Sequence, residues 1–174
     1  MNQRTEQNAL IQHGFIWQGQ IVDAAGNVTH SGPPIRNIIP QEGIDHLAGL
    51  LRAGGTLISN WYVGVGEADY VPTNGTGGAD LQSAVGESTA YTQATRPLWN
   101  NTYDGSSILT NLSNRAEFTF NATKRLYTGF LVASSTKGGT GGPVLSVARF
   151  ASPYDVPSGS TFRLGVSLTL LPAA

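Results

Sequence analysis

The sequence predicts a mainly β protein: an antiparallel β-sandwich or jelly-roll-like domain with one short amphipathic helix. The clearest evidence is the closing segment, where apolar residues alternate without a break with polar or small ones. The apolar positions are Phe162, Leu164, Val166, Leu168 and Leu170. This period of two is typical of a strand with one buried and one wet face. Similar but shorter segments, separated by turns rich in Gly, Ser and Pro, bring the expected total to about eight to ten strands.

Residues 1–12 are expected to form an N-terminal arm, and residues 13–174 a single domain. The arm is polar and has no periodicity, and termini of this kind stay disordered unless something holds them. Within it, Leu10 and Ile11 are the apolar residues that we expect to anchor the arm on a neighbouring subunit. Residues 15–22 then read as a strand, with a tight turn and an irregular return strand after it.

The helix is expected between residues 40 and 53. Proline at position 40 suits the first turn, where a missing N–H costs nothing, and Gly54 and Gly55 suit the C-terminal end. One face of this helix is apolar, with side chains at the i, i+3, i+4 and i+7 positions: Ile44, Leu47, Ala48 and Leu51. We expect that face to cover one side of a sheet or to close an open end of the β fold.

The middle of the chain is less regular. Residues 56–66 have high β propensity and read as a strand, whereas residues 67–87 read as a long irregular loop. Residues 88–99 are expected to form a strand broken by Pro97. The glycine-rich residues 137–142 read as a flexible connection between two C-terminal strands.

The composition argues against several kinds of function for this chain. Charged residues make up only 12% of the sequence and the formal net charge is -1, so nothing favours nucleic-acid binding, which normally needs a basic patch. The chain has no cysteine, which excludes disulfides and thiolate sites. No apolar run approaches the ~20 residues of a transmembrane helix, and no signal peptide is apparent. Synthesis in a cytoplasm is therefore expected.

Short motifs that suggest a nucleotide, metal or catalytic site have simpler structural explanations. Gly64-Val-Gly66 lacks the βαβ context of a dinucleotide site, so its glycines are interpreted as easing a strand into a loop. His13, His30 and His46 are too widely spaced to form a local metal-ligand pair on a helix. The acids of residues 67–87 lack the spacing of a calcium loop, and solvated carboxylates are the favoured interpretation. No catalytic residue, metal or cofactor is expected.

Four aromatic residues are candidates for contact with a partner. These are Trp17, Trp61, Tyr62 and Trp99. Tryptophan and tyrosine are enriched at protein interfaces, although such residues are more often part of a core. Together with Leu10 and Ile11, they form the set of predicted partner-binding residues.

Several segments resemble small virion proteins of tailed bacteriophages. The resemblance rests on residues 21–27, residues 37–44, the Trp61-Tyr-Val-Gly-Val65 segment, three short stretches between residues 118 and 150, and the closing residues 159–170. It covers most of the chain from about Phe15 onward. It implies a structural component of the particle, of the capsid decoration or cement type, with no catalytic residues to transfer.

Two hypotheses follow. The first is a non-enzymatic virion protein on the capsid surface that binds and stabilises the lattice of the major capsid protein, itself as a homo-oligomer; a tail or fibre-attachment component has a similar sequence character. The second is a carbohydrate-binding module or hydrolase that uses the loop of residues 67–87 and exposed aromatic side chains. The low charge favours the first, because long charged side chains lose entropy when they are immobilised at contacts.

Overall fold

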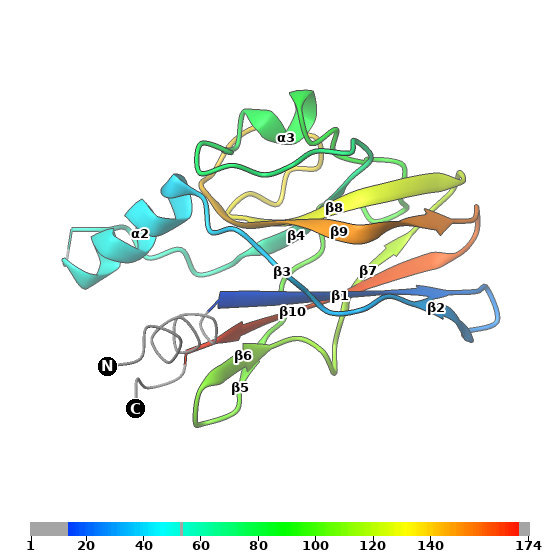
Figure 1. Cartoon of the computed structure of the whole chain (residues 1–174), viewed down its shortest axis with the longest axis horizontal. Coiled ribbons are helices and arrows are strands. Elements are labelled where there is room, and N and C mark those ends of the chain that lie inside the picture. Colours follow the sequence, from blue (N-terminus) through cyan, green and yellow to red (C-terminus); the bar gives the residue numbers. More distant parts are fainter. Residues whose placement is uncertain (1–13, 53, 171–174) are drawn as a thin grey trace, which may run out of the picture.

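The computed structural model describes residues 14–52 and 54–170, and within them the chain is mainly β, as predicted. These residues form ten strands and two helices, and the strands lie in two antiparallel sheets (Figure 1). The sandwich or jelly-roll class stays a prediction. The expected N-terminal arm lies outside the described residues.

The larger sheet has seven strands and is built around the first and last strands of the chain. Its members are β1 (Gly14–Val22), β2 (Val28–Ser31), β3 (Ile35–Arg36), β5 (Thr102–Tyr103), β6 (Ile108–Thr110), β7 (Ala116–Thr119) and β10 (Thr161–Thr169). The main strand order is β2-β1-β10-β6-β5, while β3 also pairs with β1 and β7 with β10. In β10, Phe162, Leu164 and Val166 are buried in the core as the period of two requires, and Leu168 is partly buried. Thr161 and Arg163 between them are half-buried, whereas Ser167 is buried as well.

The smaller sheet has three strands in the order β4-β8-β9, and it is buried on both faces. Its strands are β4 (Tyr62–Gly66), β8 (Lys124–Val132) and β9 (Val144–Val156). One face contributes Leu131 to the main hydrophobic cluster, whereas Phe130 beside it belongs to a second cluster on the opposite face. Burial on both faces explains why β8 and the first half of β9 read as nearly continuous apolar runs rather than as alternation.

The two sheets share one hydrophobic core. Trp17 of β1 and Leu164 of β10 belong to the same cluster as Leu131 of β8. The sheets approach closely at Gly129, because a Cβ there would lie only 2.9 Å from the Trp17 ring. The Trp17 indole N–H donates to Ser146 Oγ in β9 over 3.1 Å, so its one polar group is satisfied inside the core.

The loop of residues 67–87 covers the outer face of the smaller sheet and contains a helix that the sequence analysis did not predict. This helix, α3 (Asp80–Ser83), lies above β8 and β9 in Figure 1. Leu81 and Val85 are fully buried and pack against Phe130 and Val147 in the second cluster. The prediction of a single helix was therefore wrong, because this one-turn helix is too short for a periodic signal.

A buried ion pair fastens the glycine-rich loop between β8 and β9. The Arg96 guanidinium binds the Glu87 carboxylate at 2.7 and 2.8 Å, and both side chains are completely buried. Arg96 also donates to the carbonyls of Ser134 and Gly139, and Glu87 accepts the Gly138 N–H. The loop that the sequence analysis expected to be a flexible connection is thus anchored at several points.

Two other expectations were only partly correct. The strand expected over residues 56–66 is confined to β4, and residues 54–57 are exposed. The strand expected over residues 88–99 is absent; that stretch makes isolated bridges at Tyr91 and Leu98 instead. The backbone of residues 88–99 bonds to several different segments in turn, among them Val65, Thr119 and Ser135, so it follows no single strand as a ladder. Pro97 also has no N–H to donate.

Candidate functional site

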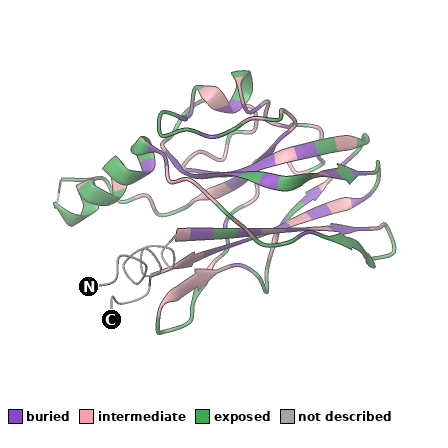
Figure 2. Cartoon of the chain, in the orientation of Figure 1, coloured by how far each residue is buried: buried purple, intermediate pink, exposed green. Residues whose placement is uncertain are grey.

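The predicted amphipathic helix forms, but its apolar face does not pack on the protein. Helix α2 (Gln41–Leu51) lies at one end of the molecule, and Figure 2 shows most of its residues as exposed. The side that contacts the body is marked by Gly43, the one fully buried residue of the helix. A Cβ at Gly43 would lie 2.9 Å from the Leu145 carbonyl oxygen, so the absence of a side chain lets the helix approach β9 this closely.

A neighbouring side of α2, centred about a quarter of a turn from Gly43, leaves aliphatic side chains partly or largely exposed to solvent. Ile44 is 47% exposed, Leu47 is 40% exposed and Leu51 is 90% exposed. We call Ile44, Leu47, Ala48 and Leu51 the α2 stripe. The expectation that this face covers a sheet or closes the fold was wrong, because the helix docks through glycine instead. An amphipathic helix that turns its apolar side outward is a candidate for binding another molecule.

The structure places two of the predicted contact residues in the core. Trp17 is 0% exposed and Trp99 is 6% exposed. The Trp99 indole N–H donates to the Val166 carbonyl over 3.1 Å, and its ring packs against Phe15. Both tryptophans therefore stabilise the described fold and do not present a surface to a partner, so we withdraw them as contact residues.

The other predicted contact residues do not form one surface with Trp17 and Trp99. Trp61 and Tyr62 are partly buried near the start of β4, and the Trp61 ring meets the His46 ring of α2 edge to face at 5.2 Å. Trp61 thus supports the helix from its inner side, and a partner role for Trp61 or Tyr62 stays a prediction. Leu10 and Ile11 lie outside the described residues.

The acidic residues around the 67–87 loop have structural partners. Three are in ion pairs: Glu67 with Lys124, Asp69 with Arg149, and Glu87 with Arg96. The hydrogen bond from the Arg149 guanidinium lowers the pKa of Asp69. Among the described residues, no group of three or more His, Asp or Glu side chains gathers closely enough to hold a metal ion.

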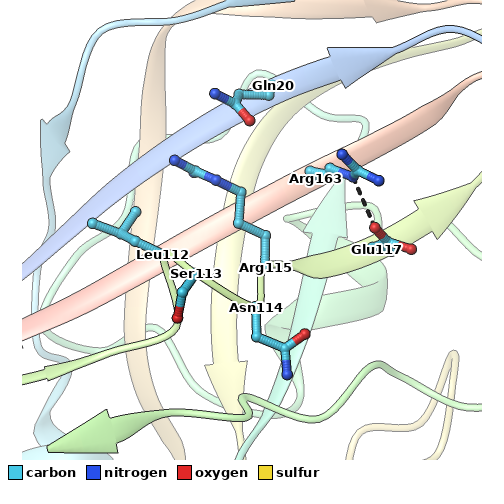
Figure 3. Close-up of a pocket in the computed structure, with 7 residues that line it drawn as sticks. All are labelled: Gln20, Leu112, Ser113, Asn114, Arg115, Glu117 and Arg163. Carbon is cyan, nitrogen blue, oxygen red and sulfur yellow. Dashed lines mark hydrogen bonds and ion pairs between the residues drawn. The ribbon is translucent and has the colours of Figure 1, made fainter. Parts of the chain in front are cut away.

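A polar pocket lies on the outer face of the seven-stranded sheet (Figure 3). Its volume is about 300 Å³, and it is lined by Gln20, Leu112, Ser113, Asn114, Arg115, Glu117 and Arg163. No pattern in the sequence predicts this pocket. Its residues come from three separate parts of the chain, and only the pairing of β1, β10 and β7 brings them together.

Comparisons with known proteins add no family to these observations. No protein-family model matches the chain, and a search of curated proteins finds no match either. Neither helix in the described part of the chain has the length and apolar character needed to cross a membrane.

Proposed function

We propose that this protein is a non-enzymatic structural component of a virus particle, of the capsid decoration or cement type. Its partner in this proposal is the lattice of the major capsid protein. The single observation that carries the proposal is the outward-facing α2 stripe. The resemblance to small virion proteins of tailed bacteriophages supplies the setting in which that stripe would be covered.

The stripe has the form of a known recognition mode. Amphipathic helices bind grooves on partner proteins through apolar side chains at i, i+3, i+4 and i+7 spacing, which are the positions that the stripe occupies. Fully burying one exposed Leu or Ile contributes roughly 1.5–3 kcal/mol, so covering Leu51, Ile44 and Leu47 supplies several kcal/mol in total. This gain offsets part of the free-energy cost of association, and the rest of the contact has to supply the remainder.

The surroundings of the helix also suit assembly. The helix extends away from the two sheets in Figure 1, where a neighbouring subunit can reach its outer side. On its inner side, Glu42 accepts the backbone N–H groups of Gly78 and Val144, which fixes the helix at its N-terminal end. A helix held in this way loses little conformational entropy on binding.

Two alternatives remain. A tail or fibre-attachment component would use the same stripe, so the structure supports it as well as it supports the capsid role. A carbohydrate-binding module based on the aromatic residues and the 67–87 loop is less well supported. Trp99 is buried and the loop packs onto the smaller sheet, which removes much of the surface that this hypothesis needs.

The first test is the number of copies in purified particles, measured by quantitative mass spectrometry against the major capsid protein. Hundreds of copies per particle support the decoration role, and a few to a dozen copies favour the tail. Absence from the particle would refute both. Particles that lack the protein should also lose resistance to heat or osmotic shock if it acts as a cement.

The second test asks whether the stripe is the binding surface. Leu51→Lys should abolish incorporation into particles while leaving the fold intact, because Leu51 is almost fully exposed. Val28→Lys is the matched control, because Val28 is an exposed aliphatic residue on β2, at the far end of the molecule from α2 in Figure 1. Normal incorporation of Leu51→Lys would show that another surface makes the contact.

A further inference from the structure

The polar pocket on the seven-stranded sheet is built on a glycine. Gly165 of β10 lies directly beneath two residues of the pocket lining, since a Cβ there would lie 2.5 Å from both Arg115 Nη1 and Leu112 Cδ2. The missing side chain lets the Arg115 guanidinium lie over the sheet. In Figure 3, Arg115 extends from the start of β7 across β10 towards β1, while Arg163 and Glu117 lie to one side.

The wall of the pocket is held by a buried polar side chain. Asn111 is fully buried; its Oδ1 accepts the Val166 N–H at 2.6 Å and its Nδ2 donates to the Leu164 carbonyl at 3.4 Å. These two bonds reach β10 on either side of Gly165. The turn that carries Ser113 and Asn114 is therefore fixed to this part of β10, because a buried amide of this kind is costly to release.

Arg115 is held in place by neutral groups. Its Nη1 donates to the Gln18 carbonyl at 2.8 Å, and its Nη2 donates to Gln18 Oε1 at 3.0 Å. Among the residues that the structure describes, Arg115 takes part in none of the ion pairs. Two of its five N–H groups are thus engaged with protein acceptors, and its charge has no carboxylate partner there.

The pocket carries one positive charge in excess. The other two charged groups of its lining, Arg163 and Glu117, pair with each other at 2.7 Å. Partial burial, and to a smaller degree the repulsion from Arg163, lower the pKa of Arg115. The pocket therefore disfavours the charged form of Arg115 while holding its guanidinium in a fixed position. A bound anion would offset the free-energy cost of partly burying that charge.

We propose that this pocket binds a small monocarboxylate ligand of the acidic-saccharide class. Gln18 accepts one N–H from each terminal nitrogen of Arg115, so the three other N–H groups of the guanidinium are the ones that can donate charge-assisted hydrogen bonds to a carboxylate. One excess positive charge suits one carboxylate, whereas Glu117 at the same site disfavours a dianion such as phosphate. Gln20, Ser113 and Asn114 supply neutral groups of the kind that bind sugar hydroxyls, and a volume of about 300 Å³ accepts one sugar ring.

The test is a titration of the full chain with sodium glucuronate, followed by amide chemical shifts in NMR and by calorimetry. Binding on the order of a millimolar is expected for a ligand this small. The shifts should be confined to the Leu112–Asn114 turn and to β10 around Gly165. Glucose, which has the same ring without the carboxylate, and inorganic phosphate should each bind at least about tenfold more weakly, since a charge-assisted hydrogen bond accounts for about that factor.

Two variants locate the site. Arg115→Gln should weaken glucuronate binding by roughly tenfold or more, because it removes the charge-assisted hydrogen bonds. Gly165→Ala should do the same with all charges kept, because the new Cβ displaces the guanidinium. Arg125→Gln is the control: it removes the same charge from an exposed pair with Asp155 on the other sheet, and binding should not change.

Three results would overturn the proposal. They are no glucuronate binding by a folded wild-type chain, equal binding of glucose or phosphate, and unchanged binding in both Arg115→Gln and Gly165→Ala. A fold check by NMR accompanies each variant, and if one variant fails to fold the other decides. None of these outcomes depends on incorporation into particles, so the pocket and the proposed virion role fail or succeed separately.

Discussion

Removing Arg96 should destabilise the protein more than any surface charge substitution. The Arg96 and Glu87 side chains are both 0% exposed, and they are joined by two hydrogen bonds of 2.7 and 2.8 Å. Arg96→Met keeps an unbranched side chain of similar length over the Phe130 ring, which the guanidinium covers at 5.5 Å. The substitution therefore leaves apolar packing largely in place and isolates the loss of charge and hydrogen bonds.

The expected magnitude follows from what remains after the substitution. Glu87 keeps one bond, from the Gly138 N–H, while the Ser134 and Gly139 carbonyls lose their donor. Removing one partner of a buried ion pair costs about 3–5 kcal/mol, because the other charge stays buried and uncompensated. That is a large part of the 5–15 kcal/mol by which domains are usually stable. For a chain of this size it corresponds to a fall in Tm of roughly 6–20 °C.

The assay is equilibrium unfolding in urea, with the free energy of unfolding measured for four proteins: wild type, Arg96→Met, Glu87→Leu and the double variant. The double variant should recover much of the loss, because no charge is left unpaired in the core. Arg125→Met serves as the control. Its pair with Asp155 is more than half exposed at 3.4 Å, so its loss should cost no more than about 1 kcal/mol.

A loss below about 1 kcal/mol for Arg96→Met would refute this reasoning, since it would mean that the pair is hydrated or easily rearranged. A double variant as unstable as the sum of the two single variants would also contradict it. That result would assign the cost to lost packing and loop anchoring instead of to an unpaired charge.

Two further predictions concern the packing of the core and the dependence of stability on pH in acid solution. Gly129→Ala should lower the free energy of unfolding by about 1–3 kcal/mol, because the new methyl group overpacks against the Trp17 ring. Gly141→Ala is the control in the same urea assay, because the space around its Cβ position is open. Backbone N–H groups of residues 106–108 lower the pKa of Asp104. The stabilising effect of its carboxylate is therefore complete above the ordinary pKa of 3.8 and declines progressively as the pH falls below that value towards the lowered pKa. Asp104→Asn should therefore lose stability relative to wild type at pH 6, and the difference in the free energy of unfolding should be smaller at pH 2. An equal difference at both pH values would contradict the assignment.

The strands were predictable wherever one face is wet. In β10, alternation gave both the strand and the direction of each side chain, because a residue facing water and a residue facing the core differ in polarity. In β8 and β9 the apolar runs still indicated strands. It was not predictable that the segment of residues 67–87 covers the outer face of the smaller sheet. That cover depends on Leu81 and Val85, whose short segment has no period of its own.

The helix shows where the hydropathy pattern misleads. The positions of Ile44, Leu47 and Leu51 correctly predicted an amphipathic helix, and the capping residues gave its limits within about two residues. The hydropathy pattern could not reveal that the helix docks through Gly43, because glycine has no side chain that contributes to such a pattern. Its close contact is with Leu145, which is far away in the sequence. An apolar face predicts burial against something, but not against the same molecule.

The polar pocket was hidden for a related reason. Arg115 and Gly165 are far apart in sequence, and their contact follows from the register in which Ala116 faces Leu164. The only signal in the sequence was the presence of arginines in a chain with few charges. For Arg96, too, a charged residue in a weakly charged and irregular segment was the available hint of a structural role.

The pairing of the first strand with the last has a consequence for how the protein is made. β1 is synthesised early, yet its longest partner is β10, and Phe15 faces Leu168 near the end of the chain. β1 cannot complete the central ladder until β10 has been synthesised, and contacts of such high sequence separation make folding slow. Until then β1 exposes an unpaired edge and the aromatic side chains of Phe15 and Trp17, so aggregation of nascent chains is the main hazard during expression.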